Sequence, residues 1–168
     1  MKAKVTLLTA ATLATFAFCA FSQTTAMGHV SVTIVSPISI AKVQDMNFGH
    51  VSVESGAGTV TLSPENRNRS ASGNVELMDG GEVSAASFTV KGYQGATFSI
   101  SLPATPVIIN NGNKNMTVTN FTSTPSGFGE LADGSKNVFV GATLIVTGDQ
   151  QLGEYASSSP FPVTVNYN

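Results

Sequence analysis

The stretch Thr97-Phe98-Ser99-Ile100-Ser101-Leu102 decides the fold class of this chain. Apolar and hydroxyl-bearing side chains alternate along it, so that one face of the segment is apolar and the other is polar. Alternation with a period of two predicts a β-strand that buries one face and exposes the other. The same pattern recurs along most of the sequence, at residues 30–34, 59–63, 87–91, 116–119, 138–146 and 161–167.

Short turn signals separate these alternating segments. Glycine and Asn/Asp supply the positive φ values that tight hairpin turns require. Eight or more short strands at this spacing, without a long helical stripe, predict an all-β fold. We expect an immunoglobulin-like β-sandwich of Greek-key type. The expected turns are at Ser55-Gly56, Gly80-Gly81, Asn110-Asn111-Gly112-Asn113, Ser126-Gly127, Asp133-Gly134 and Gly148-Asp149.

The N-terminal residues have the pattern of a cleaved signal peptide. Lys2 and Lys4 precede a charge-free apolar run over residues 5–21, and small and polar residues follow it. We expect cleavage after Ala26, with cleavage after Ser22 as the alternative. The predicted organisation is a signal peptide over 1–26 and a single β-sandwich domain over 27–168. A permanent membrane helix is disfavoured because the run is short and no positive stop-transfer flank follows it.

Cys19 is the only cysteine, and it lies within the apolar run. It is therefore expected to leave with the signal peptide, so that the exported chain has no thiol for a disulfide, for nucleophilic catalysis or for metal binding. About 140 remaining residues are enough for one hydrophobic core, which must stabilise the domain without disulfides.

The charges argue against a nucleic-acid partner. Without Lys2 and Lys4, six basic residues face ten acidic ones, a net charge of −4. Binding to nucleic acid needs a basic stripe, and the densest positive cluster here is Arg67 with Arg69. We expect these two arginines to be solvated loop residues.

No motif for catalysis, cofactor binding or metal binding is present. His29 and His50 are the only histidines, and neither belongs to a recognisable Ser-His-Asp or zinc-ligand pattern. Glycine-rich dinucleotide and phosphate-binding motifs are also absent from the sequence. We therefore expect a protein that is not an enzyme and that has no cofactor. Tyr155 is interpreted either as a hydroxyl that ties a crossover, in the manner of a tyrosine corner, or as a half-buried core tyrosine.

Several segments, in this order, resemble the bacterial domain-of-unknown-function 4402 family. The resemblance covers essentially the whole exported chain, and it implies a short exported β-protein without a known active site. The segments are Val35-Ser36-Pro37-Ile38-Ser39-Ile40, Asp45-Met46-Asn47-Phe48-Gly49, Gly58-Thr59-Val60-Thr61-Leu62-Ser63-Pro64, Ala85-Ala86-Ser87-Phe88-Thr89-Val90, Gly95-Ala96-Thr97-Phe98-Ser99-Ile100, Gly141-Ala142-Thr143-Leu144, Gly153-Glu154-Tyr155 and Val163-Thr164-Val165-Asn166-Tyr167-Asn168.

The two ends of the exported chain are similar, more distantly, to fimbrial subunits of the chaperone–usher kind, and this resemblance implies a pilin-like form of the β-sandwich. Such subunits end in an alternating strand with a penultimate tyrosine and begin with an alternating segment that can complete a neighbour's sheet. Two features depart from that pattern. Many fimbrial subunits carry a disulfide, whereas the exported chain has no cysteine, and Pro37 limits a continuous donor strand to residues 29–36. The candidate strand-exchange residues are Val30, Val32, Ile34, Phe161, Val163, Val165 and Tyr167.

Two functions follow as expectations. The first is a structural, fimbrial-type subunit of the periplasm, cell surface or extracellular space, which self-associates by strand pairing or engages a periplasmic chaperone or assembly platform. The second is a monomeric secreted or surface module that binds a glycan or a protein through its loops, with the loop at residues 110–115 as the contact region. In the second case residues 30–40 are the first strand of a self-complete domain.

Overall fold

The computed structural model describes residues 23–65 and 68–168 of the chain. Within these residues the protein is all-β, with antiparallel strands and no helix, and so contains no helix that is able to cross a membrane. The strands are β1 (Ser39–Gln44), β2 (Asn47–Phe48), β3 (Val51–Leu62), β4 (Arg69–Leu77), β5 (Val83–Ser84), β6 (Ala86–Lys91), β7 (Thr97–Ser101), β8 (Val107–Asn110), β9 (Asn115–Thr124), β10 (Phe128–Glu130), β11 (Ser135–Val146), β12 (Ala156–Ser157) and β13 (Thr164–Tyr167).

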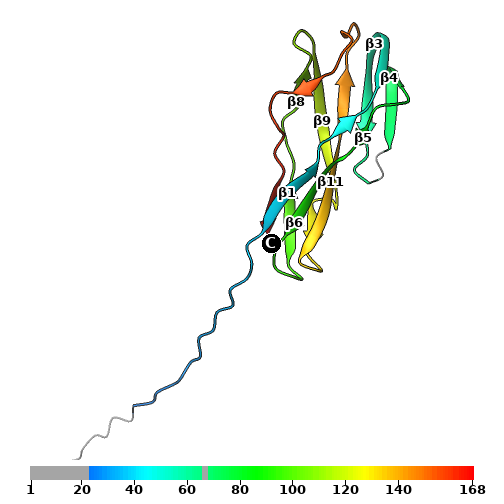
Figure 1. Ribbon diagram of the computed structural model, residues 1–168. Coiled ribbons are helices and arrows are strands. Elements are labelled where there is room, and N and C mark those ends of the chain that lie inside the picture. Colours follow the sequence, from blue (N-terminus) through cyan, green and yellow to red (C-terminus); the bar gives the residue numbers. More distant parts are fainter. Residues whose placement is uncertain (1–22, 66–67) are drawn as a thin grey trace, which may run out of the picture. The chain divides into compact units, whose positions relative to one another are not determined.

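The larger sheet is organised around β11 (Figure 1). One edge of β11 pairs with β9, which continues through β8 to β12. The other edge is shared by two neighbours: the first half of β11 pairs with β6, and the second half pairs with β3. Strand β1 extends the sheet beyond β6, and β4 extends it beyond β3. The long central strand therefore joins two halves of one sheet.

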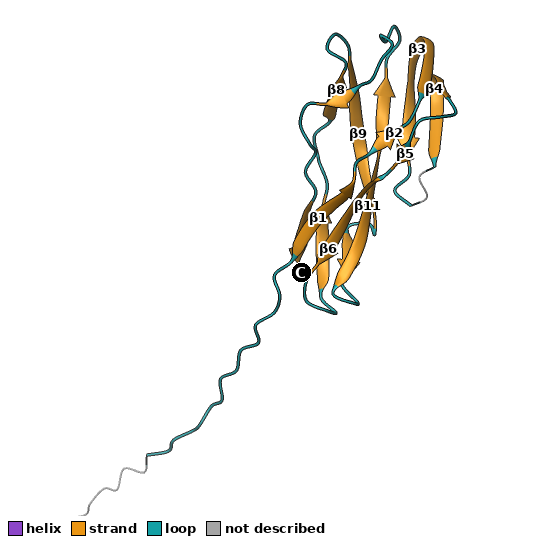
Figure 2. Cartoon of the chain, in the orientation of Figure 1, coloured by secondary structure: helices purple, strands orange, loops and turns teal. Residues whose placement is uncertain are grey.

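Two smaller sheets complete the fold. Strands β10, β7 and β13 form a three-stranded sheet, and β2 and β5 form a two-stranded one. The larger sheet curls into a half-barrel, and Figure 2 shows the strands of the fold in orange, without any helix among the described residues. Curling lets side chains from strands that are distant in the sheet reach a common interior.

The apolar side chains gather into two clusters. The first contains Phe98 and Ile100 of β7, Val165 of β13, and residues of β6 and β11, so that it joins the three-stranded sheet to the larger one. The second cluster contains side chains from β3, β4, β9 and β11 of the larger sheet. Along β11 the alternating side chains Val138, Val140, Ala142, Leu144 and Val146 are buried and divide between the two clusters. The alternation read from the sequence is confirmed there.

The expected strand at residues 30–34 is wrong, and the first strand begins only at Ser39. Residues 23–38 belong to no strand. An alternating segment becomes a strand only when it pairs with a neighbour, and residues 30–34 pair with none of the described strands. Pro37 has no N–H to donate to a sheet. The chain divides at this point into a unit that ends at Thr33 and a compact unit from Ile34 to Asn168. Residues 1–22 of the expected signal peptide (1–26), with Cys19, lie outside the described residues.

Two further expectations differ from the structure. Ser55 and Gly56 lie inside β3 rather than in a turn, because the register with β4 shifts there and the Asn74 side chain donates a hydrogen bond to the Ser55 carbonyl at 2.6 Å. The final strand begins at Thr164, not at Phe161, since Pro160 and Pro162 have no N–H for a ladder.

Candidate assembly site

The four candidate residues at the C-terminal end all lie against one core. Val165 is buried in the first cluster, and Phe161, Val163 and Tyr167 pack against the same cluster while staying partly exposed. The Phe161 ring lies 5.2 Å from that of Phe121 and 6.4 Å from that of Phe88, measured between centroids. These residues therefore contribute to the folded domain as well as to its surface.

The three candidate residues at the N-terminal end are instead almost fully exposed. The exposed fraction is 99% for Val30, 86% for Val32 and 92% for Ile34. All three lie in the extended stretch before β1, and the structure does not bring them into a sheet. Three such apolar side chains, two residues apart, form an apolar row without a covering partner in the described residues.

Strand β13 has one unpaired edge. It pairs with β7, with Val165 opposite Ile100 and Tyr167 opposite Phe98. None of the described strands pairs with its other edge. An unpaired edge presents N–H and C=O groups that can accept a further strand. Here the edge lies next to partly exposed apolar side chains, those of Phe161, Val163 and Tyr167.

Other free edges are less suited to accept a strand. On β1 the register shifts between Lys42 and Gln44, which leaves Val43 in a bulge, 66% exposed. Lys42 carries a charge on the same edge strand and forms an exposed ion pair with Asp45 at 2.7 Å. Bulges and lysines on edge strands hinder further pairing. The edge of β4 has serine, alanine and glycine at residues 70–73, which offer little apolar surface to a partner.

The Tyr167 hydroxyl ties the start of the compact unit to its C-terminal strand. It donates a hydrogen bond to the Ser36 carbonyl at 2.7 Å and accepts one from the Tyr93 N–H, also at 2.7 Å. The alternating pattern of residues 161–167 anticipated the place of Tyr167, but nothing in the sequence pointed to Ser36 or Tyr93 as its partners.

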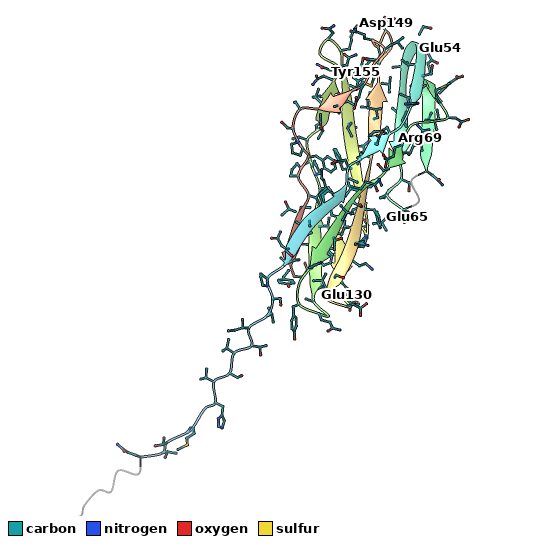
Figure 3. All side chains as sticks on the ribbon, viewed as in Figure 1. Glu54, Glu65, Arg69, Glu130, Asp149 and Tyr155 are labelled. Carbon is teal, nitrogen blue, oxygen red and sulfur yellow. The ribbon has the colours of Figure 1, made fainter. Side chains whose placement is uncertain are left out.

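Arg69 is the residue whose role sequence reasoning missed most clearly. Its guanidinium donates hydrogen bonds to the carbonyls of Phe48 at 2.6 Å, His50 at 3.0 Å and Met78 at 3.1 Å. The side chain is half-buried at the start of β4 and is labelled in Figure 3. The expectation of a solvated loop arginine is therefore wrong for Arg69, which binds three backbone carbonyls, two near the end of β2 and one just after β4. Arg67 lies outside the described residues.

Tyr155 combines the two interpretations that the sequence left open. Its ring packs against the second cluster and is half-buried. Its hydroxyl donates to the Gln151 carbonyl, four residues upstream, at 2.9 Å. Asn113 Nδ2 contacts the Gln151 side-chain oxygen at 3.2 Å, and this ties the loop at residues 110–115 to the loop before β12. Figure 3 labels Tyr155 and Asp149 at this end of the domain.

The described part of the chain contains no group of three or more His, Cys, Asp or Glu side chains with metal-binding proximity. His29 and His50 are both exposed.

One comparison with known proteins gave a match. The family model described as "Domain of unknown function (DUF4402)" matches residues 38–167, from just before β1 to the end of β13. No curated protein matches the chain.

Proposed function

The chain belongs to the DUF4402 family, and from this membership we propose that it is an exported, non-enzymatic structural subunit that associates with copies of itself through β-strand pairing. The proposed donor is residues 29–36, and the proposed acceptor is the unpaired edge of β13. The carrying observation is that one chain combines an apolar alternating segment outside any strand with an unpaired strand edge beside a partly exposed core.

The strand order supports an immunoglobulin-like sandwich with one position left open. In such domains one sheet has the order A-B-E-D and the other contains C, F and G. Strands β1, β6, β11 and β9 follow the first order, and β7 and β13 correspond to C and F. No described strand takes the G position beside β13. A strand from a neighbouring subunit at this position would complete the second sheet.

The burial of the donor side chains supplies the driving force. Covering one exposed valine or isoleucine contributes about 1.5–3 kcal/mol, so that three contribute on the order of 5–8 kcal/mol before the cost of ordering the segment. Backbone hydrogen bonds to β13 add to this gain, and they do not depend on the side chains. The subunit would be exported by its N-terminal signal and assemble at the periplasm or cell surface, with a periplasmic chaperone protecting the edge until then.

Val32→Asp tests this proposal, because Val32 is the central residue of the donor row. We expect the full chain, collected after export and heated in detergent at graded temperatures, to give a ladder of multimers that is absent for V32D. A carboxylate in the acceptor would weaken association by at least about a hundredfold. Val43→Asp is the matched control, since Val43 is also an exposed valine but lies on the bulged strand β1.

The proposal predicts that V43D keeps the ladder. A wild-type chain that runs only as monomer after the mildest treatment, or a ladder that survives in V32D, would contradict strand donation by residues 29–36.

A monomeric binding module is the second candidate, favoured by the hydrogen-bonded loops at residues 110–115 and 150–155. Asn113, Gln151 and Tyr155 form a polar surface at one end of the domain. The test is a glycan array probed with V32D, the variant expected to stay monomeric. Binding that is lost in Asn113→Ala supports this function, and an array without signal contradicts it for glycans.

A further inference from the structure

The Tyr167 hydroxyl joins three parts of the compact unit that are far apart in sequence. It contacts the carbonyl of Ser36, which precedes β1, and the backbone N–H of Tyr93, which lies in the turn between β6 and β7. Gly92 lies beneath this hydroxyl, and a Cβ at that residue would collide with it. The absence of a side chain at Gly92 is therefore what leaves room for the contact.

Ser36 lies just before β1, the first strand of the larger sheet. Ile34, two residues before it, is 92% exposed, and β1 begins three residues after it. Between them Pro37 has no N–H. Among residues 23–38, all within the described part, the bond from Tyr167 is the one hydrogen bond that the structure records. Without this bond, the nearest contacts that hold Ser36 are the packing of Ile38 against the first cluster and the pairing of β1 with β6.

Tyr167 is itself held firmly on the other side of the contact. Its backbone is paired with Phe98 in the three-stranded sheet. The next residue, Asn168, donates from its backbone N–H to the Thr97 carbonyl at 3.2 Å and contacts Thr97 Oγ1 through its side chain at 3.3 Å. The hydroxyl is therefore presented by a strand that is anchored on both sides of the tyrosine.

We propose that Tyr167 is a positioning residue that fixes where the N-terminal segment leaves the domain. It does so through the hydrogen bond from its hydroxyl to the Ser36 carbonyl, which we call the clasp. With the clasp closed, the ordered backbone begins at Ser36. With the clasp open, order begins at Ile38, which packs against the first cluster. This inference does not depend on whether the segment is donated to a neighbour, because the clasp lies within one chain.

Tyr167→Phe removes the hydroxyl and keeps the ring against the core. The measurement is the ¹⁵N heteronuclear NOE of the amides of Ile34, Val35 and Ser36, on the full chain after export. A V32D background keeps the segment from engaging a second copy. We expect the detached population of residues 34–36 to rise about fivefold to tenfold, the factor for one net hydrogen bond, so that these amides approach the values of residues 28–32.

Tyr155→Phe is the matched control, because it also removes a tyrosine hydroxyl that bonds a backbone carbonyl. It is expected to leave the NOE of residues 34–36 unchanged. Gly92→Ala is the second variant, since its methyl group displaces the hydroxyl while the tyrosine stays, and it is expected to loosen the same residues. Residues 34–36 that are as mobile in the starting chain as in Y167F, or that loosen equally in Y155F, would overturn the inference.

Discussion

Replacing Arg69 by methionine gives the sharpest test of how the fold is held together. Methionine keeps an unbranched apolar stem of similar length and removes all three hydrogen bonds to the carbonyls of Phe48, His50 and Met78. The Phe48 carbonyl is partly buried, and it loses a charge-assisted bond worth about 1.5–3 kcal/mol. The other two carbonyls are exposed, so that water replaces the guanidinium and each adds only about 0.5 kcal/mol.

We expect R69M to lower the free energy of unfolding by about 2.5–4 kcal/mol, which moves the urea midpoint down by roughly 1–2 M. Circular dichroism of the full chain at increasing urea measures this change. Arg69→Lys is the graded control, because one ammonium group keeps the charge but cannot span three carbonyls. It should lose about half as much.

A free energy of unfolding for R69M within about 0.5 kcal/mol of the wild type, an effect typical of a surface substitution, would show that the three hydrogen bonds do not stabilise the fold. An R69K variant that unfolds at the wild-type midpoint would show that a positive charge at this residue is enough for stability, without three hydrogen bonds.

Two further predictions concern packing, and thermal unfolding of the full chain checks both. Phe161→Ala removes a ring that packs on Phe121 and should lower the free energy of unfolding by about 2–4 kcal/mol. Its control is Phe128→Ala, which should change that free energy by less than about 0.5 kcal/mol because the Phe128 side chain is 67% exposed. Equal losses would show that Phe161 is not a core residue. Gly141→Ala places a methyl group against the Leu62 carbonyl and 2.8 Å from Pro64 N. It should lower the free energy of unfolding by at least about 1–3 kcal/mol. Its control is Ser135→Ala, at an exposed position of β11, which should leave that free energy almost unchanged. An unchanged melting temperature in G141A would contradict that close approach.

Alternation in the sequence was a good guide where a strand packs one face on a core. Strands β6, β7, β9 and β11 lie where the pattern placed them, because each buries its apolar side chains. Strand β4 was not anticipated, since Ser70, Ala71, Ser72 and Gly73 have no apolar alternation, and this part of the strand is specified by pairing with β3.

The opposite error occurred at residues 30–34, where the pattern is ideal but no neighbouring strand is present. A period of two reports which face can be buried, and it does not report whether a partner exists.

The candidate site was predictable in the same uneven way. The alternating pattern predicted correctly that the apolar side chains of residues 161–167 pack on the core, although Pro160 and Pro162 shorten the strand to residues 164–167. The partners of Tyr167 and Arg69 were not predictable. Ser36 is 131 residues from Tyr167, and the carbonyls that Arg69 binds carry no sequence signal at all.

The clasp between Tyr167 and Ser36 also has a consequence for biosynthesis. A ribosome makes the carbonyl of Ser36 early and the hydroxyl of Tyr167 131 residues later, so that nearly the whole domain must be synthesised before the two can meet. Contacts of such long separation form late, since loop closure must be achieved first. The N-terminal segment of a nascent chain is therefore unclasped throughout translation, and it becomes fixed to the domain only when β13 has joined its sheet.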